Sequence, residues 1–301
     1  MSRQPKGAAG PHLCVLGDLT FDYYLELELE PWADEKATAL SSLRMVGGTG
    51  ANAAVAAARL GSAVALFAPV GDDPVGEWLR AQVAASGVDV SGVHTVHGHS
   101  TQATVLRDAH RRRIIVDRGV IDNPAPIDHT ALKDADLVYA TGSPAIVRAL
   151  VDADLASTLV LGLEGWMAPV LGGSVLNASL AVTNSAGWSA FARELSGKVL
   201  TVATHGADGS TIHHLDGHSE HIPAYGAEVV DSTGAGDAFA GALCHYVALG
   251  VQLRDASHLA AAAAALSTRR PGAQAGLPTD AEVQDLITRG PSRQGDELHA
   301  G

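Results

Sequence analysis

Short apolar runs alternate with alanine-rich or helical stretches through the first part of the chain. Residues 12–17 (HLCVLG) form an apolar run that ends in glycine, and residues 47–61 (GGTGANAAVAAARLG) pass from a glycine cluster into an alanine-rich helix. A second apolar run covers residues 63–70, and helical spacing follows an aspartate–proline start over residues 72–86. Buried strands that alternate with helices are typical of a parallel sheet with helices on its faces. We therefore predict an α/β fold around a mainly parallel central sheet.

Two segments interrupt this alternation. Residues 23–29 (YYLELEL) alternate between apolar and acidic side chains, which indicates a half-exposed strand. Residues 101–107 and 113–117 are predicted to pair as a hairpin around Ala109 and His110. Both segments lie outside the main sheet and together predict a small β lid. The strand rhythm then resumes at residues 135–140, 158–162, 180–183 and 199–203.

The domain division follows from this pattern. We assign residues 1–19, 46–100 and 121–290 to the α/β domain, residues 20–45 and 101–120 to the lid, and residues 291–301 to a disordered polar tail. No run of about 18 uninterrupted apolar residues is present, so we expect no membrane span. The first 12 residues also lack the apolar core of a signal peptide.

The composition narrows the range of partners. The formal net charge is −13, whereas nucleic-acid binding needs a basic surface, so we expect no nucleic-acid partner. The densest basic run, Arg111-Arg112-Arg113, fits a solvated strand or turn, with a clamp for an anionic substrate as the alternative. Cys14 and Cys244 each lie in an apolar segment, and no disulfide framework is visible. We therefore expect a cytoplasmic protein.

The strongest functional signal is the segment 231–242 (DSTGAGDAFAGA). We predict a strand end at residues 228–230 and a helix from Ala238 onward, with a glycine-rich turn between them. The N–H groups of such a turn and the partly positive start of the helix suit a transferring phosphate. Asp237, at the N-cap or first position of the helix, can accept a proton from a substrate hydroxyl, a step that typically contributes ~10²–10⁴-fold. A plain capping aspartate is the alternative, but a cap does not require the preceding glycines.

Two further glycine-rich turns add weaker signals. Residues 47–52 (GGTGAN) open a helix, and the amide of Asn52 in its first turn can contact a polyol. This turn lacks the spacing of a dinucleotide-binding loop, and an ordinary tight turn is its alternative. Residues 204–209 (THGADG) follow a buried strand, at the sheet edge where α/β proteins bind ligands. An ordinary turn is the alternative there as well.

In this order and spacing, the three glycine-rich segments resemble those of the ribokinase-like (PfkB) carbohydrate kinase family. The resemblance extends over about residues 12–288, nearly the whole chain. It implies a three-layer α/β sandwich with a small β-sheet lid, ATP as the phosphoryl donor, and Mg²⁺. It also implies that the lid can pair with a second subunit to form a homodimer.

The resemblance assigns roles to individual residues. Asp237 matches the catalytic base, and its anion hole matches Gly234, Ala235 and Gly236. The acceptor contacts match Asp22, Gly48 and Asn52, with Thr20 and Thr49 at two further contact positions. The nucleotide-binding residues match Asn184, Thr204, Gly206 and Gly209. A monovalent-cation site for K⁺ matches Asp231 and Thr233, completed by carbonyls near residues 268–276.

Several positions depart from the family pattern. Ribokinases usually have lysine in place of Thr49, asparagine in place of Thr20 and a substrate-binding glutamate in place of Gly142. The phosphate machinery is retained while these sugar contacts differ, so ribose is not assumed.

The Asn-x-x-Glu motif of the family, which is tied to Mg²⁺ and phosphate, also departs from its pattern. It keeps Asn184 here but has Gly187 in place of the glutamate. We hypothesise either weaker magnesium handling or substitution by another acid such as Glu164.

The leading prediction is an ATP-dependent sugar kinase. A nucleoside kinase of the same family is the alternative, because small Thr49 and Gly142 would leave room for a base. A catalytically silent regulator that binds the ligand is a second alternative. The intact Asp237 and its GAGD segment are evidence against it, whereas the missing motif glutamate keeps it open.

Other conspicuous side chains are given structural roles. The histidines of residues 213–221 (HHLDGHSEH) are predicted to lie on a solvated hairpin that turns at Asp216-Gly217, rather than in a metal site. Trp166 and Trp188 are predicted to pack rather than to stack on a nucleotide.

Overall fold

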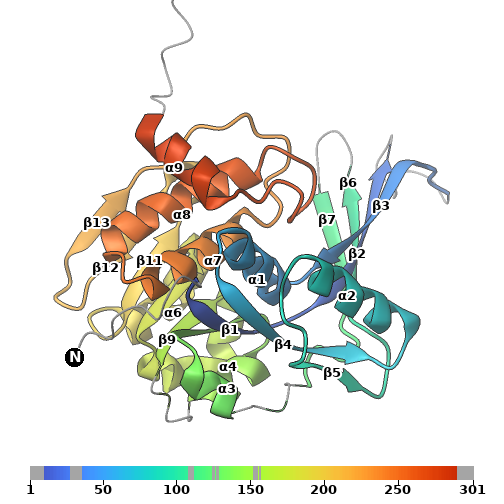
Figure 1. Ribbon diagram of the computed structural model, residues 1–301, viewed down its shortest axis with the longest axis horizontal. Helices are drawn as coiled ribbons and strands as arrows, with labels where there is room; N and C mark the ends of the chain where they lie inside the picture. The colour runs from blue at the N-terminus through green and yellow to red at the C-terminus, as the bar shows by residue number, and fades with distance from the viewer. Residues whose placement is uncertain are drawn as a thin grey trace, which may run out of the picture.

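The computed structural model describes residues 10–27, 36–107, 112–123, 126, 129–151, 155 and 157–289. Within this part of the chain, a nine-stranded sheet forms the centre of the molecule and a four-stranded sheet stands beside it (Figure 1). Helices cover both faces of the large sheet, which gives three layers (Figure 1). The predicted α/β sandwich with a second, smaller sheet is confirmed.

The strands of the central sheet are β1 (His12–Leu16), β4 (Ala63–Gly71), β5 (Val93–Val96), β8 (Leu137–Ala140), β9 (Thr158–Leu163), β10 (Leu180–Asn184), β11 (Leu200–Thr204), β12 (Ser210–His213) and β13 (Ser219–Ile222). Their order is β13-β12-β11-β10-β9-β8-β1-β4-β5. The pairs from β11 across to β5 are parallel, whereas β12 and β13 form an antiparallel edge. The carboxyl ends of the parallel strands therefore meet at one edge, where α/β sheets bind ligands.

The small sheet contains β3 (Ala39–Gly47), β2 (Thr20–Leu27), β6 (Gln102–Arg107) and β7 (Arg112–Asp117), in that order. The hairpin of β6 and β7 is antiparallel, as predicted, and β2 joins it by parallel pairing with β6. We refer to these four strands as the lid. The predicted turn at Ala109 and His110 lies outside the described residues, and so do Arg111 and the tail 291–301.

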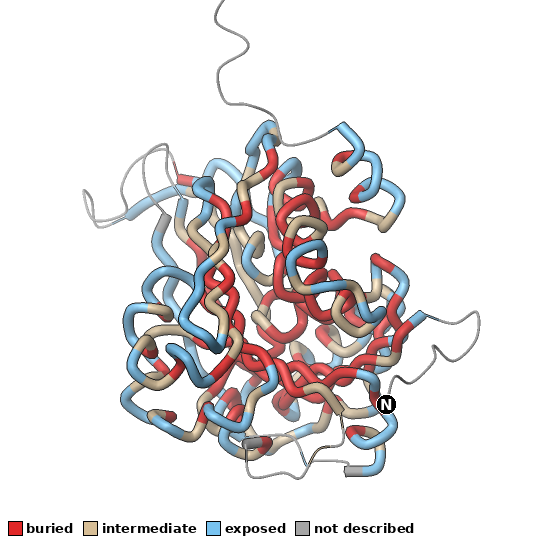
Figure 2. The backbone as a smooth tube through the Cα atoms, turned by 90° about the vertical axis from the view of Figure 1, so that its left-hand side faces the viewer, coloured by how far each residue is buried: buried red, intermediate tan, exposed pale blue. Residues whose placement is uncertain are grey.

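The helices are α1 (Thr49–Arg59), α2 (Pro74–Ala85), α3 (His129–Asp134), α4 (Pro144–Val151), α5 (Ala168–Leu171), α6 (Ser185–Leu195), α7 (Ala235–Ala248), α8 (Leu253–Ser267) and α9 (Asp280–Arg289). Short 3₁₀ helices cover Gly165–Met167, Gly172–Asn177 and Gly206–Asp208. One hydrophobic core packs α1, α2, α7, α8 and α9 onto one face of the sheet, and a second core packs α3, α4 and α6 onto the other. Buried residues accordingly concentrate on the central strands and on the helix faces turned toward them (Figure 2).

Small side chains bring α1 and α7 close together. Ala53 and Gly241 face each other at this contact, and a Cβ atom on Gly241 would overlap the carbonyl oxygen of Ala53. The alanine-rich composition of both helices thus permits a short distance between their axes. The two helices that start at the glycine-rich motifs are thereby packed against each other.

Two expectations about strands need correction. Residues 228–230 are not a strand end but part of an irregular segment, in which Val229 is 64% exposed. This segment is held by hydrogen bonds from the amides of Val230 and Asp231 to the carbonyl oxygen of Thr268, so no strand partner is needed. The short strand β5 was not predicted from the sequence, because only four residues at the sheet edge form it.

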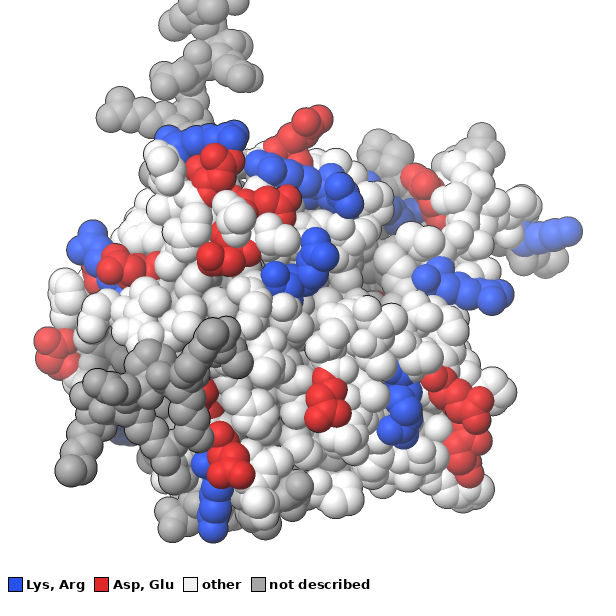
Figure 3. Space-filling view, viewed as in Figure 1, with Lys and Arg blue, Asp and Glu red and all other residues white. Residues whose placement is uncertain are grey.

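The surface carries charges of both signs. On the face shown in Figure 3, basic side chains stand singly or in small groups among acidic ones. No helix in the described part of the chain combines the length and the hydropathy that a membrane crossing requires.

Candidate active site

The glycine-rich turn of residues 231–236 leads directly into α7. Gly234 is the N-cap and adopts a left-handed conformation with φ of 73°, which glycine reaches without strain. A Cβ atom there would also come within 2.5 Å of the Cβ atom of Ala273. Asp237 is the third residue of the helix, so the prediction of an N-cap or first position was wrong: Gly234 takes the cap.

The predicted anion hole consists of the backbone N–H groups of Gly234, Ala235 and Gly236. In the structure, the Ala235 amide already donates to the carbonyl oxygen of Ser232 across 3.2 Å. The amides of Gly236 and Asp237 belong to the first helical turn, whose N–H groups have no acceptor within the helix. An anion at this positive helix end is therefore expected to face Gly236 and Asp237 in particular.

The carboxylate of Asp237 is held by a residue from the other glycine-rich motif. Asn52 Nδ2 donates to Asp237 Oδ2 across 2.8 Å, and the Asn52 side chain is buried. Asp237 itself is only partly exposed. Desolvation raises its pKa to about 8 against the opposing effect of the Asn52 hydrogen bond, and the charges of Asp18, Glu164 and Asp22 add to the rise. A carboxyl group with this pKa is a strong base when it is ionised.

Gln274 completes this arrangement and was not predicted from the sequence. Its Nε2 atom donates to Asn52 Oδ1 across 3.0 Å, which turns the donor end of the Asn52 amide toward Asp237. Gln274 lies in the loop before α9, and no motif marks it. Its distance of 222 residues from Asn52 along the chain explains why spacing alone does not reveal it.

The acceptor residues predicted on β2 lie together. Thr20 Oγ1 donates to Asp22 Oδ1 across 2.7 Å. Desolvation raises the pKa of Asp22 to about 6, the Thr20 hydrogen bond opposes this, and the charge of Asp18 adds to it. A Cβ atom on Gly47 would overlap the Asp22 carboxylate, so the glycine leaves room for that side chain.

Asp18 is a buried acid that the sequence motifs did not single out. Its Oδ1 atom accepts hydrogen bonds from Thr49 Oγ1 at 2.6 Å and from the Gly50 amide at 3.0 Å. Gly48, a predicted acceptor contact, has φ of 98°, and a Cβ atom on it would lie 2.6 Å from the Asp18 carbonyl oxygen. A Cβ atom on Gly142 would overlap Asp18 Oδ1. Asp18 thus occupies the space that a side chain at position 142 would enter.

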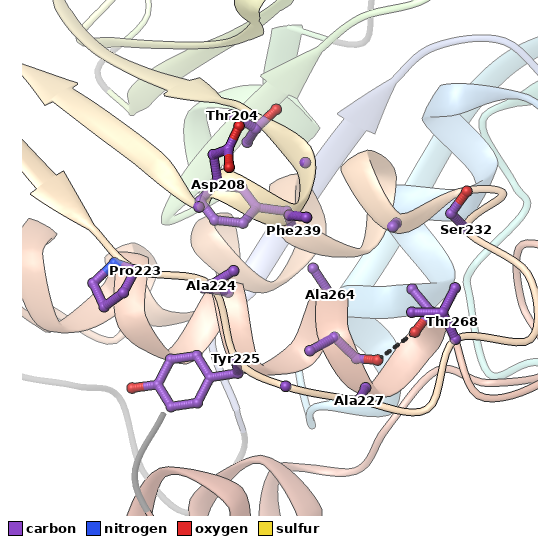
Figure 4. Close-up of a pocket in the computed structure, with 18 of the residues that line it drawn as sticks. Thr204, Asp208, Pro223, Ala224, Tyr225, Ala227, Ser232, Phe239, Ala264 and Thr268 are labelled. Carbon is purple, nitrogen blue, oxygen red and sulfur yellow. Dashed lines mark hydrogen bonds between the residues drawn. The ribbon is translucent and has the colours of Figure 1, made fainter. Parts of the chain in front are cut away.

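A cavity of about 790 Å³ lies beside the start of α7. Thr204, Gly206 and Gly209, the predicted nucleotide-binding residues after β11, line it together with Gly236. Figure 4 shows the turn that carries Thr204 and Asp208 on one side, the segment through Tyr225 and Ala227 on the other, and Phe239 of α7 between them. The cavity is thus bounded at one end by the turn that precedes Asp237.

Asn184, by contrast, does not line this cavity in the described structure. It is the N-cap of α6, and its Oδ1 atom accepts from the Gly187 amide across 2.8 Å. A Cβ atom on Gly187 would overlap Thr183 Oγ1, which donates to the carbonyl oxygen of Leu163. The glutamate of the family motif therefore has no space at position 187.

Glu164 lies close to the altered motif. It follows β9, and a Cβ atom on the adjacent Gly165 would be 3.1 Å from the Ala186 carbonyl oxygen. Desolvation raises the pKa of Glu164, and the hydrogen bond from Trp166 Nε1 at 3.0 Å opposes the rise. Glu164 thus lies in a segment that approaches the altered motif, in which Gly187 replaces the glutamate.

Asp231 joins two loops at the predicted monovalent-cation site. Its Oδ1 atom accepts from the amide and the hydroxyl of Thr233, and its Oδ2 atom accepts from the Gly272 amide at 2.8 Å. Desolvation acts to raise the pKa of Asp231, but these hydrogen bonds outweigh it and the pKa is lowered. Because its carboxylate oxygens already accept these hydrogen bonds, backbone carbonyls of the same loops are the better candidates for K⁺ ligands.

The histidine-rich segment forms a hairpin, as predicted, with Gly217 at a φ of 83° in the turn between β12 and β13. His213 is not fully solvated, since its ring stacks on Trp188 with 3.7 Å between the ring centroids. Trp188 packs against the second core, whereas Trp166 is 48% exposed and binds Glu164. No cluster of three or more potential metal ligands is present among the residues that the structure describes.

Comparison with known proteins identifies similar chains. The model of the pfkB family of carbohydrate kinases matches residues 11–160 and 179–280. Ribokinase of Bacillus subtilis is 29% identical over 293 residues, which span 92% of this chain and 99% of that protein. ATP-dependent ribose-1-phosphate kinase of Halopiger xanaduensis is 28% identical over 289 residues, 91% of this chain and 97% of that protein.

Solved structures of ribokinases have a similar fold. The structure of Arabidopsis thaliana ribokinase complexed with ribose and ATP superposes with a TM-score of 0.81 at 22% sequence identity. The match covers 93% of this chain and 99% of the plant protein. The likeness in fold therefore extends over nearly the whole chain.

Proposed function

The chain belongs to the pfkB family of carbohydrate kinases, and we propose that it transfers the γ-phosphoryl group of ATP to a hydroxyl of a sugar or sugar-like acceptor. The first turn of α7 carries the proposal. Gly236 lines the cavity on one side of this turn, and the carboxylate of the next residue, Asp237, meets Asn52. A phosphate-binding helix end and a base of raised pKa thus stand one residue apart.

In the proposed reaction, the acceptor oxygen forms a bond to the γ-phosphorus while the bond to the bridging oxygen breaks. The bridging oxygen leaves with the electron pair as part of ADP, and the acceptor proton passes to the Asp237 carboxylate. The amides at the start of α7 stabilise the charge on the transferring group, and each well-aimed donor of this kind contributes about 10²–10³-fold. Phosphoryl transfer then needs little beyond positioning and charge stabilisation.

ATP is the proposed donor because the cavity beside α7 fits it in size and chemistry. Cavities that hold small ligands and cofactors are about 300–1,000 Å³ in volume and largely apolar. Ala261, Ala264 and Phe239 supply apolar walls for a base, and the helix end supplies N–H donors for phosphates. The structure of the similar plant ribokinase is of its complex with ribose and ATP.

Mg²⁺ is proposed to be held near Glu164 and Asn184. Carboxylate and amide oxygens are suitable ligands for this hard cation, and Glu164 lies between two residues, Leu163 and Gly165, that approach the altered motif closely. The bound ion would neutralise charge on the ATP phosphates. K⁺ is proposed to bind by carbonyls of the loops that Asp231 joins, so that it would act on the shape of the turn before α7.

A homodimer through the lid is a further part of the proposal. The lid exposes apolar side chains on two of its strands: Leu40 and Leu43 on β3, and Ile114, Ile115 and Val116 on β7 are 49–64% exposed. An apolar area of this kind on a small sheet marks an interaction surface. A second copy of the chain would cover it by pairing lid against lid.

An acceptor screen tests the proposed reaction. The protein is incubated with ATP, Mg²⁺ and one acceptor at a time, and ADP is measured together with the mass of the acceptor product. We expect one ADP for each phosphorylated acceptor, and a loss of both with Asp237→Asn. Turnover that survives in Asp237→Asn contradicts the proposed base. Binding of an acceptor without any turnover favours the ligand-binding regulator instead.

A further inference from the structure

We propose that Asp18 is an acceptor-specificity residue: its free carboxylate oxygen binds a hydroxyl or amino group of the acceptor, and its charge makes the site select uncharged acceptors over phosphorylated ones. This inference rests on the proposed kinase function. It concerns a residue that none of the glycine-rich motifs contains.

The hydrogen bonding of Asp18 is incomplete. The residue is 8% exposed and follows β1 at the carboxyl edge of the sheet. Its Oδ1 atom has two donors, Thr49 Oγ1 and the Gly50 amide. Among the described residues, no side chain or backbone group donates to its Oδ2 atom. The Oδ2 atom is not among the buried polar atoms that lack a partner, so it can be reached from outside the protein. A hydrogen-bond donor on the acceptor can therefore bind to it.

The backbone around Asp18 is shaped to hold this side chain. Gly142, at the end of β8, has φ of 86°, and a Cβ atom on it would overlap Asp18 Oδ1. A Cβ atom on Gly50 would lie 2.9 Å from the Asp18 amide nitrogen. The Cβ atom on Gly50 would meet only backbone atoms of Gly17 and Asp18, so this glycine allows the two backbone segments to approach closely. The carboxylate itself occupies a volume that Gly142 leaves to it.

Asp18 also stands among the other acids of the site. Desolvation is the main cause that raises the pKa of Asp22, of Glu164 and of Asp237, and the charge of Asp18 contributes to each rise. The charges that contribute to the pKa of these three carboxyl groups are all negative and belong to other acids of the site. A phosphate on the acceptor would add negative charge to this set, whereas a neutral polyol, a nucleoside or an amino sugar would not.

A simpler reading is that Asp18 only caps α1. Gly48, the N-cap of that helix, offers no side chain, and Asp18 Oδ1, in the loop after β1, accepts from the Gly50 amide in its place. The substitution Asp18→Asn separates the two roles. Asparagine keeps an oxygen for Thr49 and Gly50 but removes the charge and the second acceptor oxygen. A residue that only caps would therefore tolerate it.

The experiment compares how the wild type, Asp18→Asn and Asp136→Asn phosphorylate three acceptors. Asp136 is the matched control, because its carboxylate accepts from the His12 amide at the opposite end of β1. The acceptors are ribose and inosine, which are uncharged, and ribose 1-phosphate. Values of kcat and KM are measured for each acceptor, KM is measured for ATP, and thermal unfolding checks the fold.

We expect the wild type to favour ribose or inosine over ribose 1-phosphate. Asp18→Asn should raise KM for the uncharged acceptor ~10- to 100-fold, the loss of one hydrogen bond to a charged group, with KM for ATP unchanged. The variant should also reduce the ratio of kcat/KM for the uncharged acceptor to kcat/KM for ribose 1-phosphate. Asp136→Asn should match the wild type in all three respects.

Two results overturn the inference while the kinase function stands: an unchanged acceptor KM in Asp18→Asn, or a wild type that prefers ribose 1-phosphate. The preference of the wild type tests the inference even if Asp18→Asn fails to fold. If no acceptor is phosphorylated, the proposed function fails by itself. Titration calorimetry with the same three compounds then tests Asp18, since equal binding by wild type and variant contradicts its role.

Discussion

Asn52 Nδ2 donates a hydrogen bond to Asp237 Oδ2 across 2.8 Å and so joins the first turns of α1 and α7. The two residues are 185 positions apart in the chain. Their helices pack closely through alanine and glycine, so the contact between the two glycine-rich motifs is fixed by the core beneath them. Gln274 holds the amide of Asn52 in the orientation that this contact needs.

Asp237→Asn tests the base directly. Asparagine keeps the shape of the side chain and can still accept from Asn52, but it cannot take up the acceptor proton. We expect kcat to fall by about 10²–10⁴-fold, the usual contribution of a positioned general base, with thermal stability retained. Asp285→Asn, an exposed carboxyl group of α9, is the control and should leave kcat unchanged. A loss of less than tenfold would contradict the assignment.

The pKa of Asp237 predicts how activity depends on pH. The base works in its ionised form, and its pKa is about 8, so kcat/KM should rise with pH up to about 8 and then level off. Asn52 lowers this pKa by its hydrogen bond, whereas the charge of Asp18 raises it. Asn52→Ala should therefore move the rise to higher pH, and Asp18→Asn should move it to lower pH. A pH–rate profile of kcat/KM for the three proteins checks both directions; shifts of the same sign would refute this reading.

Glu164→Gln tests the acid proposed to replace the motif glutamate. Glutamine keeps the oxygen that accepts from Trp166 but removes the charge that would attract Mg²⁺. We expect half-maximal activity at a higher Mg²⁺ concentration, and a weaker Mg²⁺ titration by calorimetry in the presence of ADP. An unchanged Mg²⁺ dependence would show that Glu164 has no part in holding the ion. Glu194→Gln, on a partly exposed position of α6, is the control.

The lid surface predicts a dimer that a charge can disrupt. Leu43 on β3 and Ile114 on β7 are each about half exposed. If a second copy covers them, Leu43→Glu and Ile114→Glu should shift the protein from dimer to monomer in light-scattering measurements. Leu215→Glu is the control, because that residue is at least as exposed but lies on the hairpin between β12 and β13. A monomeric wild type would exclude the lid as a dimer interface under those conditions.

The sequence predicted those helices and strands for which the spacing of apolar residues and the flanking turn residues indicated the same element. The buried strands, the glycine-rich turn before α1 and the hairpin of β6 and β7 follow from local pattern alone. The helix α7 starts at Ala235, three residues before the predicted start at Ala238, because Gly234 takes the N-cap in a left-handed conformation.

Residues that act through long-range contacts could not be predicted. Gln274 and Asp18 matter because of what the folded chain places beside them, and neither stands in a motif. The volume left by Gly142 illustrates the same point, since it is filled by the side chain of Asp18 from the loop after β1. Local pattern identifies the site, whereas its detailed chemistry depends on tertiary packing.

Restoring the motif glutamate should destabilise the protein unless space is made for it. A Cβ atom on Gly187 would overlap Thr183 Oγ1, so Gly187→Glu should lower the free energy of unfolding by about 1–3 kcal/mol, the usual cost of overpacking. Thr183→Ala removes the obstructing hydroxyl but also its hydrogen bond to Leu163, at a cost of about 1 kcal/mol.

The two costs should not add, because the hydroxyl that clashes is absent from the double variant. Urea denaturation of the wild type, both single variants and the double variant gives the coupling energy. We expect the double variant to be more stable than the sum of the single effects predicts. Additive effects would mean that α6 shifts to admit the glutamate, and that its loss from the motif has no steric cause.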